Sequence, residues 1–235
     1  MQQLKTKVIN LDRRNDRWEQ FNEKTKNFSI LNIERFSAVD GKLLGDSLEL
    51  QHLFRKNPYF PKKNPFNFHR HLNNGEKGAA LSHFLIWKQI AVQSEPVLIL
   101  EDDVFFSEHF ETNLERLFLY VKENPSLQWD LLFLGHTDDV PIYNDDVIHQ
   151  NQDFKLISIN GQPSRSHGGG LFSYILTPDC AKKLLKIIET YGISQPLDWI
   201  IFDLFHTLTC FKVFPHFIFS IPFGMFNQDS DIQCH

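Results

Sequence analysis

Short runs of apolar residues alternate along the chain with longer segments in which apolar and polar positions are interleaved. The runs at 97–100 and 131–134 contain only aliphatic residues and phenylalanine, which favours strands buried on both faces. The segments 79–91 and 181–188 place apolar residues three and four positions apart, which is typical of helices with one buried face. This alternation predicts an α/β protein.

The order of the predicted elements indicates a Rossmann-like domain. A strand at 7–11, a helix that contains Trp18 and a strand at 33–39 form a βαβ unit at the start. The last expected strand is aromatic and covers 213–219. A length of 235 residues suits one domain. We therefore expect 1–235 to form a single domain with a mostly parallel central sheet flanked by helices.

The segment 51–75 departs from this alternation. It has no acidic residue, five Lys or Arg residues and three His residues, with several Phe and Pro and no sustained periodicity. Loops of that length in compact domains are usually functional or disordered. The sequence therefore predicts either a basic, aromatic lid over a site or a solvated insertion.

Composition and charge exclude several classes of function. A net charge of −5 argues against a dedicated nucleic-acid binder. The three cysteines are widely spaced and form no Cys-x-x-Cys pair, so a disulfide framework or structural zinc site is not expected. The polar N-terminus leads directly into a strand, and no apolar run reaches about 18 residues. We expect a cytoplasmic protein without a transmembrane segment, with peripheral contact at the inner face of a membrane as an option.

The strongest chemical feature is the carboxylate triplet Glu101-Asp102-Asp103 at the end of the predicted strand 97–100. Glu101 and Asp103 fall on one face by the two-residue period, and ligands of open α/β sheets bind beyond the carboxyl ends of strands. Adjacent carboxylates repel, so a hard cation such as Mg²⁺ or Mn²⁺, completed by substrate phosphate oxygens, would keep them ionised. The alternative is a solvated acidic loop in which Asp102 or Asp103 caps the next helix.

Eight short sequence motifs occur in an order that is similar to that of a known family. They are VINLDRR at 8–14, FSAVDG at 36–41, GEKGAALSH at 75–83, LILEDDV at 98–104, WDLLFLG at 129–135, YIL at 174–176, PLD at 196–198 and SDI at 230–232. In this order they resemble glycosyltransferase family 25, which includes bacterial lipooligosaccharide galactosyltransferases and procollagen hydroxylysine galactosyltransferases. The likeness covers nearly the whole chain.

The resemblance implies a GT-A-type fold and an inverting transfer from a nucleotide-sugar donor, usually UDP-galactose, to a hydroxyl group. It also implies Mn²⁺ as the metal and a glycan or a hydroxylysine-type acceptor, with lipooligosaccharide biosynthesis as one setting. The glycine-rich approach 166–170 and the segment 51–75 depart from the pattern of bacterial members, so the acceptor stays open.

Three carboxylates receive catalytic roles. Glu101 and Asp103 match the Asp-x-Asp pair of GT-A enzymes and are assigned as metal ligands. Asp198 is the candidate general base or acceptor-orienting group, because a hydroxyl acceptor needs a positioned carboxylate within hydrogen-bond reach. The competing interpretation makes Asp198 a helix N-cap.

A second group of residues is predicted to bind the donor. It comprises Asn10, Arg13, Arg14, Arg17, Asp40, Glu76, Ser82, His83, Asp102, Gly169 and Asp231. Guanidinium groups after the first strand suit phosphates or uracil carbonyls, helix starts suit anions, and glycine lets the backbone approach a ligand closely. The alternatives are exposed ion pairs of the arginines with Asp12 and Asp16, a turn-forming Asp40, and a core role for His83.

Two other functions compete with the transferase. One is a catalytically inactive module of the same fold that binds a nucleotide sugar or a carbohydrate, because fold does not guarantee activity. The other is nucleotidyl transfer or phosphoester hydrolysis, which the sequence disfavours because no second well-spaced acidic cluster accompanies the triplet.

Overall fold

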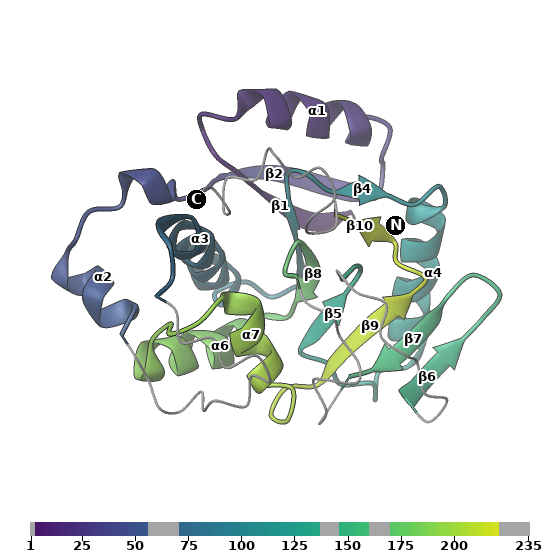
Figure 1. Ribbon diagram of the computed structural model, residues 1–235. Coiled ribbons are helices and arrows are strands. Elements are labelled where there is room, and N and C mark those ends of the chain that lie inside the picture. The colour runs from purple at the N-terminus through teal and green to yellow at the C-terminus, as the bar shows by residue number, and fades with distance from the viewer. Residues whose placement is uncertain (1–2, 56–70, 137–145, 160–169, 221–235) are drawn as a thin grey trace.

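A computed structural model describes residues 3–55, 71–136, 146–159 and 170–220 and is built around one large sheet (Figure 1). The strand order is β2-β1-β3-β8-β5-β9-β7-β6. The strands are β1 (Leu4–Asn10), β2 (Leu31–Ser37), β3 (Val97–Glu101), β5 (Leu131–Phe133), β6 (Val147–Gln150), β7 (Lys155–Ser158), β8 (Ser173–Leu176) and β9 (Cys210–Phe214).

Most strands of the large sheet run in one direction, as the sequence predicts. β1 pairs in parallel with β2 and β3, and β5 pairs in parallel with β9. β8 is inserted antiparallel between β3 and β5, and β7 runs antiparallel to β9 and β6. The carboxyl ends of β1, β2, β3, β5 and β9 therefore meet at one edge of the sheet, here called the carboxyl edge.

Helices cover both faces of this sheet and create two cores (Figure 1). The helices are α1 (Asn15–Thr25), α2 (Leu48–Leu53), α3 (Asn74–Ile90), α4 (Phe110–Glu123), α6 (Pro178–Tyr191) and α7 (Leu197–Asp203). Trp87 of α3, Leu184 of α6 and Ile200 of α7 are buried in one core. Phe21 of α1 and Leu114 of α4 are buried in the other. The α/β Rossmann-like fold class is confirmed, and no helix of the described residues has the length and hydrophobicity to cross a bilayer.

Capping residues fix the start of α3, and the contact of this start with Gly41 places it next to the carboxyl edge. Asn73 is the N-cap of α3 and forms a capping box with Glu76, in which each side chain accepts from the other residue's backbone N–H at 2.8 Å. Gly41, just after β2, lies against this start, because a Cβ on Gly41 would stand 1.9 Å from the Asn74 carbonyl oxygen. The first turn of α3 therefore lies at the carboxyl edge.

Two sequence expectations are corrected or limited by the structure. The strand expected at 213–219 is two strands, because β9 ends at Phe214 and β10 (Ile218–Phe219) pairs antiparallel with β4 (Phe105–Phe106). Pro215 lies between them and has no N–H to donate to a ladder. Of the segment 51–75, the first residues belong to α2 and the last to α3, whereas 56–70 lie outside the described residues. The lid therefore stays a prediction.

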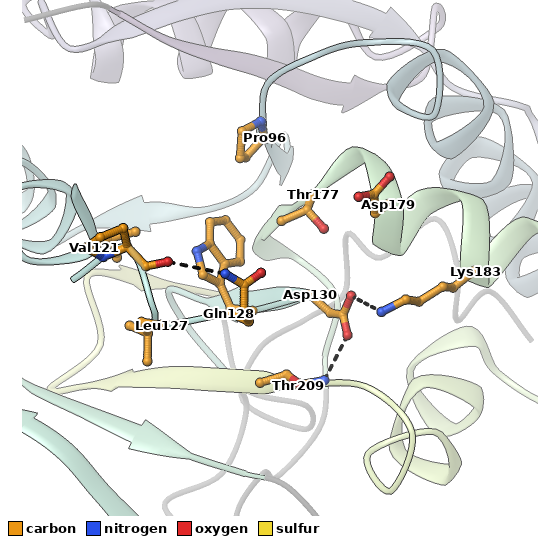
Figure 2. A pocket seen from close by; sticks show the side chains of 11 residues that line it. Pro96, Val121, Leu127, Gln128, Asp130, Thr177, Asp179, Lys183 and Thr209 are labelled. Atoms are coloured by element: carbon orange, nitrogen blue, oxygen red, sulfur yellow. Dashed lines mark hydrogen bonds and ion pairs between the residues drawn. The ribbon is translucent and has the colours of Figure 1, made fainter. Parts of the chain in front are cut away.

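A polar hollow of about 430 Å³ lies at the opposite edge of the sheet, where β3, β5 and β9 begin (Figure 2). Asp130 is 6% exposed at its wall. Its carboxylate accepts from Lys183 Nζ at 2.7 Å and from the Thr209 N–H at 3.0 Å. These bonds occupy both carboxylate oxygens and tie α6 to the start of β9, so Asp130 has a structural role here.

Candidate active site

The acidic triplet lies at the carboxyl edge because β3 delivers it there. Val97 to Leu100 are completely buried, and Glu101 is the last residue of the strand. Asp102 and Asp103 follow in a turn, Asp102 with only 8% of its surface exposed. Three carboxyl groups are thus partly or fully removed from water within three residues.

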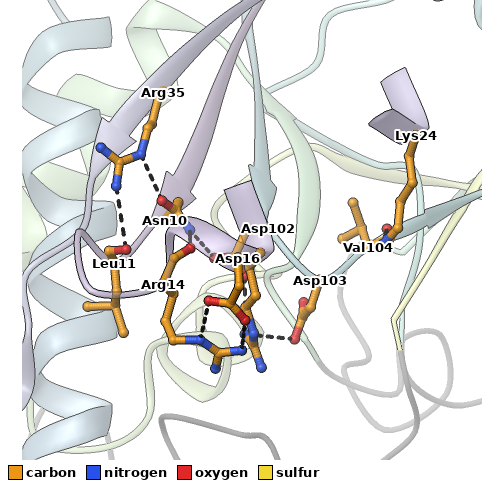
Figure 3. Close-up of polar contacts among 10 residues, drawn as sticks. Asn10, Leu11, Arg14, Asp16, Lys24, Arg35, Asp102, Asp103 and Val104 are labelled. Atoms are coloured by element: carbon orange, nitrogen blue, oxygen red, sulfur yellow. Dashed lines mark hydrogen bonds and ion pairs between the residues drawn. The ribbon is translucent and has the colours of Figure 1, made fainter. Parts of the chain in front are cut away.

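Asp102 is held by β1 and α1 rather than directed to solvent (Figure 3). Asn10 Nδ2 donates to Asp102 Oδ2 at 2.6 Å, and Arg17 Nη1 lies 3.2 Å from Asp102 Oδ1. Asn10 also donates to the Arg14 carbonyl oxygen at 3.0 Å and accepts from Arg35 Nε at 2.7 Å. Because both oxygens of Asp102 have protein partners, this residue fixes the triplet in place.

Asp103 and Glu101 have fewer partners. Asp103 Oδ2 is 3.6 Å from Arg17 Nη1, while its buried Oδ1 has no hydrogen-bond partner among the described residues. Burial raises the pKa of Asp103, opposed by the Arg17 charge. Burial, followed by the charges of Asp103 and Asp102, raises the pKa of Glu101 to about 8. Both groups are unfavourable as anions without a further cation.

The residues at the end of β3 fit a hard divalent cation. Glu101 and Asp103 offer carboxylate oxygens, and one of these, Asp103 Oδ1, is buried and has no hydrogen-bond partner in the described part of the chain. No group of three or more potential His, Cys, Asp or Glu ligands occurs within the described ranges. Two carboxylates suit Mg²⁺ or Mn²⁺, which usually keep water and substrate phosphate oxygens in their shells.

Asp198 lies in the first turn of α7, where Pro196 occupies the N-cap position. Its carboxylate accepts from the Trp199 N–H at 3.0 Å and from the Gly170 N–H at 3.4 Å. Burial raises the pKa of Asp198 and the charge of Glu76 adds to the effect, whereas its backbone hydrogen bonds oppose it. The Asp198 charge in turn contributes to the raised pKa of Glu101. The starts of α3 and α7 and the end of β3 therefore act on one another electrostatically.

Of the three arginines predicted to bind the donor, Arg17 lies against the triplet, 3.2 Å from Asp102 and 3.6 Å from Asp103. Arg14 pairs with Asp16 at 2.8 Å, as the surface-pair interpretation expects. Arg13 Nε donates to Asp40 at 2.6 Å. Asp40 also accepts from the Lys42 N–H at 2.9 Å, where it caps the short helix Gly41–Leu43, so its turn-forming role is present.

Ser82 is fully buried and its hydroxyl already serves the fold. It donates to the Gly78 carbonyl oxygen at 2.8 Å and accepts from the Val39 N–H at 2.9 Å. A Cβ on Gly78 would stand 2.6 Å from the Val39 carbonyl oxygen, so this glycine permits the close approach. Ser82 therefore anchors the segment after β2 to α3, and donor contact by Ser82 stays a prediction.

His83 is 3% exposed and belongs to a buried polar cluster that sequence reasoning did not find. Its Nδ1 lies 2.8 Å from Tyr174 Oη, which also accepts from Trp87 Nε1 at 2.9 Å. Burial lowers the pKa of His83 to about 4. The sequence did contain a signal for this cluster. Tyr174 and Trp87 lie in segments that are otherwise apolar, and the hydroxyl and indole N–H groups of such buried residues need hydrogen-bond partners.

The sequence analysis also missed two cations near the triplet. Arg35 contacts Asn10 and lies 3.0 Å from Asp12, and Lys24 Nζ donates to the Val104 carbonyl oxygen at 3.1 Å (Figure 3). The charges of Asp103 and Asp102 act on Lys24. Gly169 and Asp231 lie outside the described residues.

Comparison with known proteins identifies one family. A sequence model described as "Glycosyltransferase family 25 (LPS biosynthesis protein)" matches residues 3–201. The chain is 31% identical over 194 residues to "Procollagen lysyl hydroxylase and glycosyltransferase" of Acanthamoeba polyphaga mimivirus, an alignment that covers 77% of this chain and 19% of that protein.

Two animal proteins are also similar. "Procollagen galactosyltransferase 1-B" of Xenopus laevis is 36% identical over 129 residues, covering 54% of this chain and 20% of its own length. "Inactive glycosyltransferase 25 family member 3" of Mus musculus is 31% identical over 162 residues, covering 68% of this chain and 24% of its own length. The chain thus spans a quarter or less of these three relatives.

Proposed function

The chain belongs to glycosyltransferase family 25, and we propose that it transfers a hexose, galactose first among candidates, from a UDP-sugar to an acceptor hydroxyl with inversion. The observation that carries the proposal is the pair Glu101 and Asp103, partly buried at the carboxyl edge with one oxygen lacking a partner in the described residues. A glycan or hydroxylysine-type acceptor and a cytoplasmic location remain predictions from the sequence.

The residues around the triplet support binding of a nucleoside diphosphate together with Mg²⁺ or Mn²⁺. Glu101 and Asp103 would hold the ion, which when bound supplies stabilisation for the negative charge of the departing diphosphate. Arg17 is already adjacent to both aspartates and carries a guanidinium group suited to phosphate oxygens. Asp102 holds the Arg17 guanidinium group in position, and Asn10 in turn holds Asp102.

Asp198 is proposed as the general base. In an inverting transfer the acceptor oxygen forms a bond to the anomeric carbon, the bond from that carbon to the diphosphate breaks, and the acceptor proton passes to a carboxylate. Burial raises the pKa of Asp198 above the usual value for aspartate, which brings its basicity closer to neutral pH. Its hydrogen bonds to the Gly170 and Trp199 N–H groups orient the carboxylate.

A second candidate is a nucleotide-sugar or carbohydrate-binding module without catalysis. One observation favours it, namely that a relative covering 68% of this chain carries the name of an inactive family member. Such a module would bind the ligand without turnover, so measuring binding and UDP release on the same protein distinguishes the two candidates.

The test measures UDP release from several UDP-sugars with and without Mn²⁺, together with UDP binding by calorimetry. The variant is Asp103→Asn, and the matched control is Asp179→Asn, an exposed aspartate at the start of α6. We expect metal-dependent release that falls at least about 100-fold in Asp103→Asn and is unchanged in the control. Binding without release, across a panel that includes glycan and hydroxylysine acceptors, would instead support the module. Metal-independent release would contradict the proposed metal site.

A further inference from the structure

Three side chains from two elements meet in the core beneath the carboxyl edge. Tyr174 of β8 is completely buried, and its ring stacks on His83 with centroids 5.7 Å apart. Tyr174 Oη lies 2.8 Å from His83 Nδ1 and 2.9 Å from Trp87 Nε1. His83 and Trp87 are four residues apart on α3, so one helical face presents both nitrogens to one hydroxyl.

The hydrogen-bonding capacities of these groups determine where the proton lies. The indole N–H of Trp87 can only donate, so Tyr174 Oη accepts from it. If His83 Nδ1 also donated, the Tyr174 hydroxyl proton would point into the apolar core without an acceptor among the described contacts, which is costly. The favourable arrangement has Tyr174 donating to His83 Nδ1. The imidazole proton is then on Nε2.

The cluster lies close to the acidic end of β3. Tyr174 is directly opposite Ile99 in the β3–β8 register, and Glu101 lies two residues further on the same face. His83 is one helical turn nearer than Trp87 to the start of α3, which is at the carboxyl edge. The contact with Tyr174 uses His83 Nδ1, and no hydrogen bond of His83 Nε2 occurs within the described residues.

We propose that Tyr174, with its hydroxyl oriented by Trp87, is a positioning residue that holds His83 as the Nε2–H tautomer, which donates to an oxygen of the bound nucleotide sugar. The contact of His83 with the nucleotide sugar rests on the proposed transferase function, whereas the assignment of the Nε2–H tautomer does not. A neutral donor suits this place, because a histidinium would repel a cation held by Glu101 and Asp103. Burial, which lowers the pKa of His83 to about 4, keeps the imidazole uncharged at neutral pH.

The tautomer is tested by nitrogen-15 NMR of the full chain labelled at its histidines, with the His83 signals assigned by their loss in His83→Gln. We expect Nε2 protonated and Nδ1 unprotonated at pH 7 in the native protein. Tyr174→Phe removes only the hydroxyl and should shift the tautomer ratio about tenfold toward Nδ1–H. Tyr120→Phe, on α4 against the other face of the sheet and in contact with His149, is the matched control and should leave the His83 tautomer ratio unchanged. A native His83 protonated on Nδ1, or on both nitrogens, overturns the proposal whether or not the protein has activity.

The ligand is tested by comparing His83→Gln, whose amide can donate from near the Nε2 position, with His83→Phe, which cannot. We expect the phenylalanine variant to raise the KM for the UDP-sugar about tenfold and the glutamine variant to recover most of that loss. Weaker binding of UDP itself would assign the contact to the UDP part of the donor, and unchanged UDP binding would assign it to the transferred sugar. Equal kinetics for both variants and the native protein overturn the ligand contact. Absence of turnover in the native protein, with the NMR result intact, would count against the proposed function alone.

Discussion

The side-chain amide of Asn10 donates to Asp102 Oδ2 across 2.6 Å and joins the ends of β1 and β3. Arg35 and the Arg14 carbonyl oxygen occupy the remaining polar atoms of that amide, so the contact is set from several sides. Both oxygens of the middle carboxylate are therefore bound within the protein, whereas Asp103 Oδ1 has no partner among the described residues. The sequence already separated Glu101 and Asp103, as predicted metal ligands, from Asp102, which was predicted to bind the donor, but it did not indicate the contacts that hold Asp102.

Asn10→Ala should destabilise the protein by about 2 kcal/mol, because it removes a buried hydrogen bond to a charged group. The midpoint of urea unfolding measures the change. Asn15→Ala is the matched control, since Asn15 also bonds a carboxylate, that of Glu19, but on the exposed side of α1. Equal losses of unfolding free energy in both variants would show that the buried Asn10–Asp102 hydrogen bond stabilises the protein no more than an exposed one.

Glu101 should make the metal-free protein less stable as pH rises. Its folded-state pKa of about 8 exceeds the ordinary value of 4.5, so the stability it contributes is complete below about 4.5 and is lost as pH rises through 8. The slope reaches at most about 1.4 kcal/mol for each pH unit. Thermal unfolding between pH 6 and 9 should therefore show a steeper decline in the native protein than in Glu101→Gln. Mn²⁺ should oppose the decline, because it binds the carboxylate form. Parallel curves for the two proteins would refute this prediction.

His83 should make the fold sensitive to acid. Its pKa of about 4 in the folded protein is below the ordinary value of 6.5, so the stability tied to the neutral imidazole is present above 6.5 and is lost as pH falls toward 4. His83→Gln should be less stable at pH 7 but lose less stability between pH 7 and 5. His52→Gln, at an exposed position of α2, should follow the native protein. Urea unfolding at each pH provides the comparison.

The sequence predicts the features that are encoded locally. The opening βαβ unit, the Thr177 cap of α6 and the position of the triplet at a strand end follow from periodicity and capping residues. Pro215 was a visible signal that the last aromatic segment would divide, although the aromatic pattern suggested one strand.

The sequence did not predict which residues far apart along the chain become neighbours in the fold. Arg14 and Arg17 lie on the same short segment, yet one pairs with Asp16 and the other with the triplet, because the direction of α1 decides which side chain reaches β3. The antiparallel insertion of β8 brings Tyr174 beside His83, and no local pattern specifies which strands become neighbours. Buried polar partners therefore had to come from the structure.

Arg17 and a bound metal ion should substitute for one another. Arg17→Ala removes the cation next to buried Asp102 and partly buried Asp103, and leaving these carboxylates without it should cost about 3 kcal/mol. If Glu101 and Asp103 bind Mn²⁺, added Mn²⁺ should recover much of that loss, so the metal-dependent rise in melting temperature should be larger in Arg17→Ala than in the native protein. Arg14→Ala, whose partner Asp16 is mostly exposed, should show a smaller loss and an unchanged response to Mn²⁺. An identical rise in all three proteins would mean that Arg17 and the metal ion do not substitute for one another, and no rise in any of them would mean that the triplet holds no metal ion.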